Sequence, residues 1–490
     1  MKAGTSIVRS VALTVTMRWT DRLIGVLSTI ILARLLAPED YGIVAQAYVL
    51  IGFTSAVLDL GVGLALIQKR DPTPDHYSTA WTMRIGQAAC IGLVVFFGAP
   101  FVGDYFHEPR VVDVIRVLGA GILLGSFENI GVITFQKEMK FGLDFQFSFA
   151  KRMCSFIVTI ALAAVWRSYW ALVVGTLVGT AVGVVISYGM HNMRPRPSVV
   201  HFRELFAFSQ WALMRGIGNY LKSSLDRVFV GRRGNTEIIG AYNVADEIAA
   251  MPSGELLAPL YRALFPAFVH ARDDPAELKR IYLLAQSLQT MLVLPASAGL
   301  ALVAPEIVSL FLGAKWTLAV PLLQVLALVE AGHALLTGSG YILLTMGRVR
   351  STAVIAWVQV LGLVVPALIF FPDAGALDIA RLRVFSAACG VVVAIAIMRG
   401  VLPGLRTRDV VANAWRPVLG TAVMATVIVG LNEAVQLSVW SALVMKVSIG
   451  VAVYVLSIWA SWFVSGCPIG GETYAMEKLS LLWARIGPTR

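Results

Sequence analysis

The sequence predicts an all-α, polytopic membrane protein. Of its 490 residues 58% are hydrophobic and only 14% are charged, whereas a soluble domain is about a quarter charged. Many apolar runs reach the roughly 20 residues that a helix needs to cross a bilayer. Runs such as 91–97 show no alternation of polar and apolar residues, which excludes the strands of a transmembrane barrel. Any function is therefore expected in or at the membrane.

The apolar runs follow one another along the whole chain, and we predict about fourteen transmembrane helices. Lys2 and Arg9 precede the first run, which contains charged residues and lacks a small-residue cleavage pattern, so we expect a retained helix rather than a signal peptide. The predicted spans are 11–36, 41–67, 78–100, 111–135, 144–166, 168–190, 207–231, 237–263, 281–304, 318–346, 351–371, 381–400, 414–432 and 440–464.

The distribution of basic residues predicts the orientation of these helices. When the connections are assigned alternately to the two sides, twenty Lys and Arg residues fall on the side of the termini and about eight on the other. The positive-inside rule then places both termini in the cytoplasm. The net charge of +11 is thus explained by topology, and no nucleic acid partner is expected.

The two halves of the chain resemble each other. A shift of 198 residues aligns 38–42 with 236–240. This pattern predicts a parallel repeat of two pseudo-symmetric six-helix lobes, as in several transporter folds. The predicted divisions are an N-terminal lobe at 1–197, a C-terminal lobe at 198–408, and two further helices with an interfacial C-terminal tail at 409–490.

Charged residues inside two predicted spans mark the candidate functional site. A charge at bilayer depth is costly, so such residues usually face a bundle interior or a water-filled cavity. Cations exceed anions in both spans, and Arg and Lys are the side chains that bind phosphate. The alternative is that these residues snorkel to the interface or form structural pairs. The predicted substrate-binding cations are Arg18, Arg22, Arg215, Lys222 and Arg227.

A second set of residues is predicted to bind a coupling ion or to form charge pairs. Carboxylates in span 237–263 surround Pro252 and Gly254, where an interrupted helix can bind a proton or sodium ion. The alternative role is to neutralise nearby cations. A proton relay and a structural pair are both consistent with Glu330 and His333, three residues apart. The full set is Asp21, Asp59, Asp226, Asp246, Glu247, Glu255, Glu330 and His333.

No metal site, cofactor or enzymatic activity is expected from the motifs. The four cysteines lack the paired spacing of zinc sites or disulfides. The chain contains no Gly-x-x-x-x-Gly-Lys-[Ser/Thr] loop and no Gly-x-Ser-x-Gly elbow. Proton or sodium coupling stays open.

Three stretches resemble a known family: Leu-Ala-Arg-Leu-Leu-Ala-Pro-Glu-Asp-Tyr-Gly at 32–42, Asp-Leu-Gly-Val-Gly at 59–63 and Ile-Gln at 67–68. They are similar to the polysaccharide-transporter branch, Wzx and WzxC-like exopolysaccharide exporters, of the multidrug/oligosaccharidyl-lipid/polysaccharide flippases. The resemblance implies two lobes around a central cavity, alternating access, and a multi-pass protein of the bacterial inner membrane. By position on the matching helices, the five cations above would line that cavity.

The resemblance also implies a cargo and partners. The cargo would be an undecaprenyl-pyrophosphate-linked oligosaccharide, translocated for exopolysaccharide or O-antigen biosynthesis. Membrane lipids, a polysaccharide polymerase and a chain-length regulator would be partners. A lipid-linked peptidoglycan precursor flippase is the nearest alternative. A small-molecule or cation antiporter of the multidrug extrusion type is another, although excess cations in the spans argue against cationic cargo.

Overall fold

The computed structural model describes residues 23–58, 62–69, 71–138, 140–434, 438–468, 470–474 and 477. Regular structure in these residues is entirely helical, which confirms the all-α prediction. After the apolar helix Leu23–Leu35, the longer helices are α2 (Pro38–Leu58), α4 (Pro74–Phe106), α5 (Arg110–Ser126), α7 (Phe141–Trp166), α8 (Trp170–Met190), α9 (Phe202–Arg233), α10 (Thr236–His270), α11 (Pro275–Leu302), α13 (Ala319–Thr345), α14 (Val349–Val365), α15 (Ala376–Val401), α16 (Thr407–Ala434) and α17 (Val439–Val464).

Nine helices in the described part of the chain are long and apolar enough to cross a membrane. The chain is therefore a multi-pass membrane protein. Helices α9 and α10, which correspond to predicted spans 207–231 and 237–263, are not among the nine; they contain most of the charged positions singled out above. The count of fourteen spans stays a prediction.

In the described residues one predicted span, 111–135, is interrupted. Span 41–67 is described as α2 and the short α3 (Val62–Gln68), with 59–61 outside the described residues. Span 111–135 ends its helix at Ser126, because the buried Asn129 folds a turn: its side chain accepts a hydrogen bond from the amide of Gly131 at 2.9 Å and donates one to the carbonyl of Met193 at 2.7 Å. A 3-10 turn (Ile130–Val132) and α6 (Ile133–Lys137) follow. Asn side chains favour such local bonds over helix continuation.

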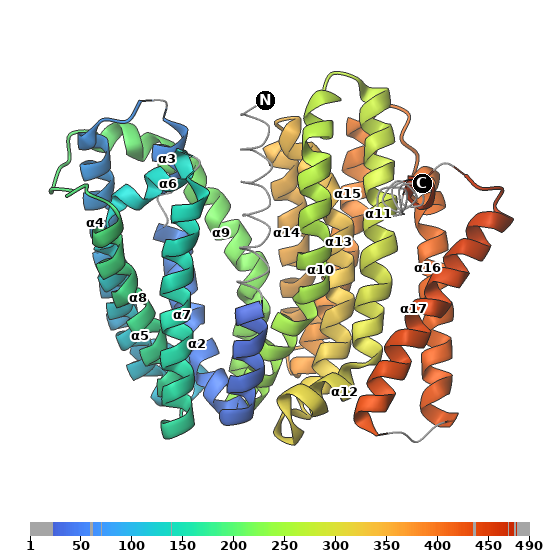
Figure 1. Cartoon of the computed structure of the whole chain (residues 1–490), viewed down its shortest axis with the longest axis horizontal. Coiled ribbons are helices and arrows are strands. Elements are labelled where there is room, and N and C mark those ends of the chain that lie inside the picture. Colours follow the sequence, from blue (N-terminus) through green and yellow to red (C-terminus); the bar gives the residue numbers. More distant parts are fainter. Residues whose placement is uncertain are drawn as a thin grey trace, which may run out of the picture. The chain divides into compact units, whose positions relative to one another are not determined.

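The contacts divide the chain into two compact units, 1–243 and 244–490, with the boundary inside α10. The predicted divisions at 197 and 408 stay predictions. In the first unit, α2 packs against α4, α5 and α9, and α7 packs along α8 (Figure 1). Its largest core between α2, α4 and α5 includes Ile43, Val95 and Ile115, which are at most 1% exposed.

The second unit has its core between α10, α11, α13 and α15. Tyr261, Phe268, Tyr282 and Met398 are almost fully buried there. Helices α16 and α17 pack side by side, and α16 also lies along α11 (Figure 1). The link after α17 returns to α16 through a buried ion pair in which Arg416 Nε lies 2.8 Å from Glu472 Oε1.

The start of α2 crosses the start of α10 at two glycines. A methyl group on Gly42 would lie 1.7 Å from the carbonyl oxygen of Thr236, and one on Gly240 would lie 1.8 Å from that of Pro38. Pro38 and Thr236 are 198 residues apart, as are Gly42 and Gly240. The two stretches that the repeat aligns therefore contact each other reciprocally, and only glycine permits this approach of the backbones.

The neighbouring residues of 38–42 have structural roles in the same place. Asp40 accepts hydrogen bonds from the amides of Ala37 and Tyr169, both at 2.9 Å, so it caps α2 and fixes the turn before α8. Glu39 pairs with Arg110 at the start of α5. Arg110 also donates to Glu108 at 2.7 Å, and this hydrogen bond lowers the pKa of the Glu108 carboxyl. The Pro-Glu-Asp-Tyr-Gly stretch thus connects α2, α5, α8 and α10.

Candidate functional site

The described residues include only part of the predicted cationic site. Arg18, Asp21, Arg22 and Asp59 lie outside them. Arg215 lies in α9, with its side chain outside the described part. The structural account of the site therefore begins in the second half of α9.

Lys222, Asp226 and Arg227 lie within five residues on α9, and Asp226 is the most deeply buried of them. Asp226 is 1% exposed, and Lys222 and Arg227 are half-buried. The hydroxyl of Tyr242, from α10, donates to Asp226 Oδ2 at 2.8 Å. Burying a carboxylate costs free energy unless polar groups form hydrogen bonds with it. The cluster thus combines two basic side chains with one carboxyl group.

An apolar cavity of about 260 Å³ lies beside this segment of α9, between α2, α4 and α9. Phe53, Tyr105 and Leu225 are among its lining residues. Tyr220 closes one side, because its hydroxyl donates to the carbonyl of Val49 at 2.6 Å and its ring packs on Gly52. The cavity can accommodate hydrocarbon but offers little to a sugar.

In the second unit Asp246 is paired. Its Oδ1 lies 2.8 Å from Nη1 of Arg383 on α15, and the two side chains are only 13% and 10% exposed. The predicted interruption at Pro252 and Gly254 is wrong, because α10 runs unbroken from Thr236 to His270. Proline is tolerated within membrane helices when neighbouring groups bond the freed backbone atoms.

The other two carboxylates of α10 differ in exposure. Glu247 is exposed and Glu255 is half-buried. Whether they bind a coupling ion or form charge pairs stays a prediction.

Glu330 and His333 form a polar recess with α10. Glu330 Oε1 lies 3.3 Å from His333 Nδ1, and the hydroxyl of Ser253 donates to Glu330 Oε2 at 2.7 Å. The pair borders a cavity of about 280 Å³ lined also by Tyr261 and Tyr341, whose stacked rings are 4.7 Å apart. Carboxylate, imidazole and aromatic faces together can bind a hydroxylated molecule or exchange a proton.

Arg84 is a further cation inside a predicted span. Its position within the apolar run 78–100 is the feature of the sequence that could have identified it. Its guanidinium donates to the carbonyl of Ser126 at 3.1 and 3.0 Å, where α5 ends. Glu128 beside it pairs with Lys151 of α7 at 3.1 Å. Arg84 therefore completes the end of α5 while bordering a cavity of about 460 Å³.

Comparison with known proteins supports the predicted family. Residues 31–321 match the family described as "Polysaccharide biosynthesis protein". The lipopolysaccharide biosynthesis protein WzxC of Escherichia coli K12 is 24% identical over 66% of this chain and 67% of its own length. The succinoglycan biosynthesis transport protein ExoT of Rhizobium meliloti is 27% identical over 61% of each chain. The matched stretches thus span about three fifths to two thirds of these relatives.

The fold is similar to that of a solved transporter. The lipid II flippase MurJ, in an inward closed conformation, superposes with a TM-score of 0.76 at 12% identity over 92% of this chain and 99% of MurJ. At this identity the likeness concerns the fold alone. Because the family match covers more than half of its residues, this multi-pass membrane protein belongs to the polysaccharide biosynthesis protein family.

Proposed function

We propose that the protein is a flippase that moves an undecaprenyl-pyrophosphate-linked oligosaccharide from the cytoplasmic to the outer leaflet of the bacterial inner membrane. The product would serve exopolysaccharide or O-antigen biosynthesis. The names of WzxC and ExoT and the fold shared with MurJ support this class of transporter. The polymerase and chain-length regulator of the same polymer are its proposed partners.

The observation that favours this function is the charged cluster of Lys222, Asp226 and Arg227 on α9. A bare pyrophosphate in hydrocarbon would cost tens of kcal/mol, so its passage needs a hydrated path with fixed cations. Each cation at bilayer depth costs about 2.5–3.5 kcal/mol on insertion scales. Only 14% of the residues of this chain are charged. Binding of an anionic headgroup would explain why several basic side chains are nevertheless retained within the membrane. Arg18, Arg22 and Arg215 are proposed members of the same cationic path.

The proposed mechanism is alternating access without covalent chemistry. The pyrophosphate and sugars enter the cationic path while the polyprenyl tail stays in lipid. Rocking of the lobes then opens the path to the other side. Glu330 and His333 are the proposed site of proton coupling, because a carboxylate and an imidazole in contact can pass a proton between them. Asp246 is the less favoured site, since Arg383 already neutralises it.

The test uses a strain lacking the gene, complemented with variants. We expect lipid-linked repeat units to accumulate on the cytoplasmic face of the deletion strain. Lys222→Ala, at normal abundance in the membrane, should lower export about 10- to 100-fold, since a hydrogen bond to a charged group contributes about 1.5–3 kcal/mol. Lys140→Ala is the matched control, because Lys140 is 57% exposed outside the predicted spans. Wild-type export by Lys222→Ala, or accumulation on the outer face, would contradict the proposal.

The second candidate is a flippase for a lipid-linked peptidoglycan precursor, which the TM-score of 0.76 with MurJ favours. Expression in cells depleted of their own lipid II flippase separates the two. Restored growth supports this second candidate, whereas unchanged lysis supports the oligosaccharide. Resistance to cationic drugs would instead support an antiporter of the multidrug extrusion type.

A further inference from the structure

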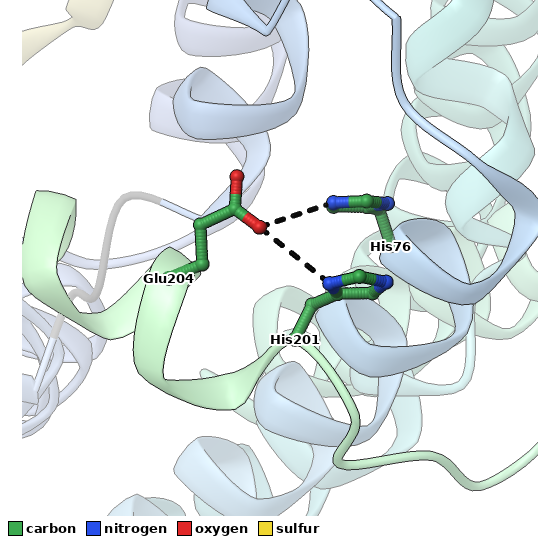
Figure 2. A group of neighbouring side chains, drawn as sticks. All are labelled: His76, His201 and Glu204. Atoms are coloured by element: carbon green, nitrogen blue, oxygen red, sulfur yellow. Dashed lines mark hydrogen bonds and ion pairs between the residues drawn. The ribbon is translucent and has the colours of Figure 1, made fainter.

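Two histidines and a glutamate from distant parts of the sequence meet at the start of α9 (Figure 2). His76 lies in the first turn of α4, His201 directly precedes α9, and Glu204 lies in its first turn. Glu204 Oε2 lies 3.2 Å from His76 Nε2 and 3.5 Å from His201 Nδ1. The two imidazole rings stack with their centroids 3.5 Å apart. Three side chains of metal-binding type thus bring one ligand atom each within 4.8 Å of the others.

Two of the three separations between these atoms match tetrahedral coordination. Zn²⁺ binds imidazole nitrogen and carboxylate oxygen at about 2.0–2.1 Å, which places neighbouring ligand atoms of a tetrahedron about 3.4 Å apart. The separations from Glu204 Oε2 to the two histidines, 3.2 and 3.5 Å, lie on either side of this value. The two imidazole nitrogens lie within 4.8 Å of each other, and one of the stacked rings would have to turn for both lone pairs to point at one ion. We propose that His76, His201 and Glu204 bind a divalent transition-metal ion, Zn²⁺ first among them, with the fourth position open to water.

The surroundings of His76 orient it as a ligand. Its side chain is 5% exposed, and its Nδ1 lies 2.6 Å from the hydroxyl of Thr73 and 3.2 Å from the Thr73 amide. In the tautomer with hydrogen on Nδ1, that nitrogen donates to the hydroxyl and Nε2 keeps its lone pair. Metal-bound histidines are regularly held by such a second contact. Metal binding would favour this tautomer over the other one, in which Nδ1 accepts the hydrogen bond from the Thr73 amide.

Lys69 is the charged group nearest to the carboxylate. It pairs with Glu204 Oε1, the oxygen that faces away from the histidines, and is 27% exposed. The contact leaves Oε2 directed at both imidazoles, as Figure 2 shows. The positive charge of Lys69 beside the carboxylate weakens metal binding, and the flexible side chain of this half-buried lysine can move toward solvent when a metal binds.

The proposed site is independent of the transport function and would join α4 to the link before α9. His76 and His201 are 125 residues apart, so no spacing motif reveals them, and the cysteines on which the sequence expectation of no metal was based take no part. A bound ion would fix the end of the link 191–201 against α4. It would therefore make this end of the first unit more rigid.

Metal titration of the full-length protein tests the site. After removal of any affinity tag and of bound metal, Zn²⁺ is titrated calorimetrically into detergent-solubilised protein. We expect one ion per chain. His201→Gln and Glu204→Gln should each weaken binding by at least about 100-fold, because loss of even a second-shell partner costs 10- to 100-fold. His270→Gln, an exposed histidine at the end of α10, is the matched control and should bind as wild type.

Two further readouts distinguish lost ligands from lost folding. Zinc should raise the melting temperature of the wild type and of His270→Gln but not of the two ligand variants, since only a protein that binds the ion is stabilised by it. Cobalt bound to the wild type should show the visible absorption of a tetrahedral nitrogen and oxygen site. Equal zinc affinity in wild type and in folded His201→Gln and Glu204→Gln would overturn the proposal, as would a wild type that binds no zinc.

Discussion

At the scale of single residues, the pair of Asp246 and Arg383 permits a sharp test of which carboxylates are structural. Both side chains are nearly buried and their atoms are 2.8 Å apart. Arg383→Met should destabilise the protein by about 3–5 kcal/mol, because it removes the cation that is paired with a nearly buried carboxylate. The double variant Asp246→Asn with Arg383→Met should recover most of that loss, and a cycle of melting curves measures the coupling.

If Asp246 instead bound a coupling ion, the outcome would differ. Arg383→Met would then leave a site that sodium or a proton stabilises, and the melting temperature would rise with sodium concentration or with acidity. The double variant would lose export as well as this response. Export that survives in the double variant assigns Asp246 a structural role.

The sequence predicts residue types of the site better than their partners. Charges in span 207–231 identify Lys222, Asp226 and Arg227 directly. Tyr242 as the donor to Asp226 is not predictable, because a tyrosine in a predicted helix gives no sign of its partner. The same applies to Arg416 and Glu472, which are 56 residues apart and meet only through the packing of α16. Pairing is a property of tertiary structure.

At the scale of elements, the close crossing of α2 and α10 predicts that the protein loses stability when Gly42 or Gly240 is replaced. Gly42→Ala and Gly240→Ala would each place a methyl group within 1.8 Å of a carbonyl oxygen, so the helix starts must separate. Overpacking of this kind costs about 1–3 kcal/mol. We expect a lower melting temperature and reduced export in both variants.

Matched variants make this prediction specific. Gly189→Ala in α8 meets no atom within 4 Å and should be neutral or slightly stabilising. Because one separation of the helices relieves both clashes, the double variant Gly42→Ala with Gly240→Ala should cost clearly less than the sum of the two. Strict additivity, or wild-type melting of both single variants, would show that the crossing does not constrain the protein.

Apolar runs in the sequence predict the positions of the helices well, but they predict the ends of the helices less accurately. In the described residues each predicted span from 41–67 onward coincides with one or more helices, because hydropathy and length identify such segments. The end of α5 at Ser126 is not visible in hydropathy, since it depends on hydrogen bonds of Asn129 with residues about 60 positions away. Conversely, Pro252 suggests a break that α10 does not have.

At the scale of the whole molecule, the length of α9 makes the orientation of the protein in the membrane testable by experiment. Its 32 residues extend for about 48 Å, which exceeds the roughly 30 Å of the hydrocarbon core. We predict that α9 spans the bilayer, which would place the link before α9, with the proposed metal site, and the crossing of α2 and α10 just after it on opposite sides of the membrane. The positive-inside pattern predicts that the link lies in the cytoplasm.

Cysteine labelling measures this assignment. In a background with the four native cysteines replaced by serine, we introduce Val199→Cys in the link and Glu237→Cys at the start of α10, both at exposed positions. A membrane-impermeant maleimide added to intact cells should label Glu237→Cys and spare Val199→Cys until the cells are opened. The reverse pattern would invert the molecule and place the proposed metal site outside. With the predicted six spans before the link and eight after it, the expected result would place both termini in the cytoplasm as well.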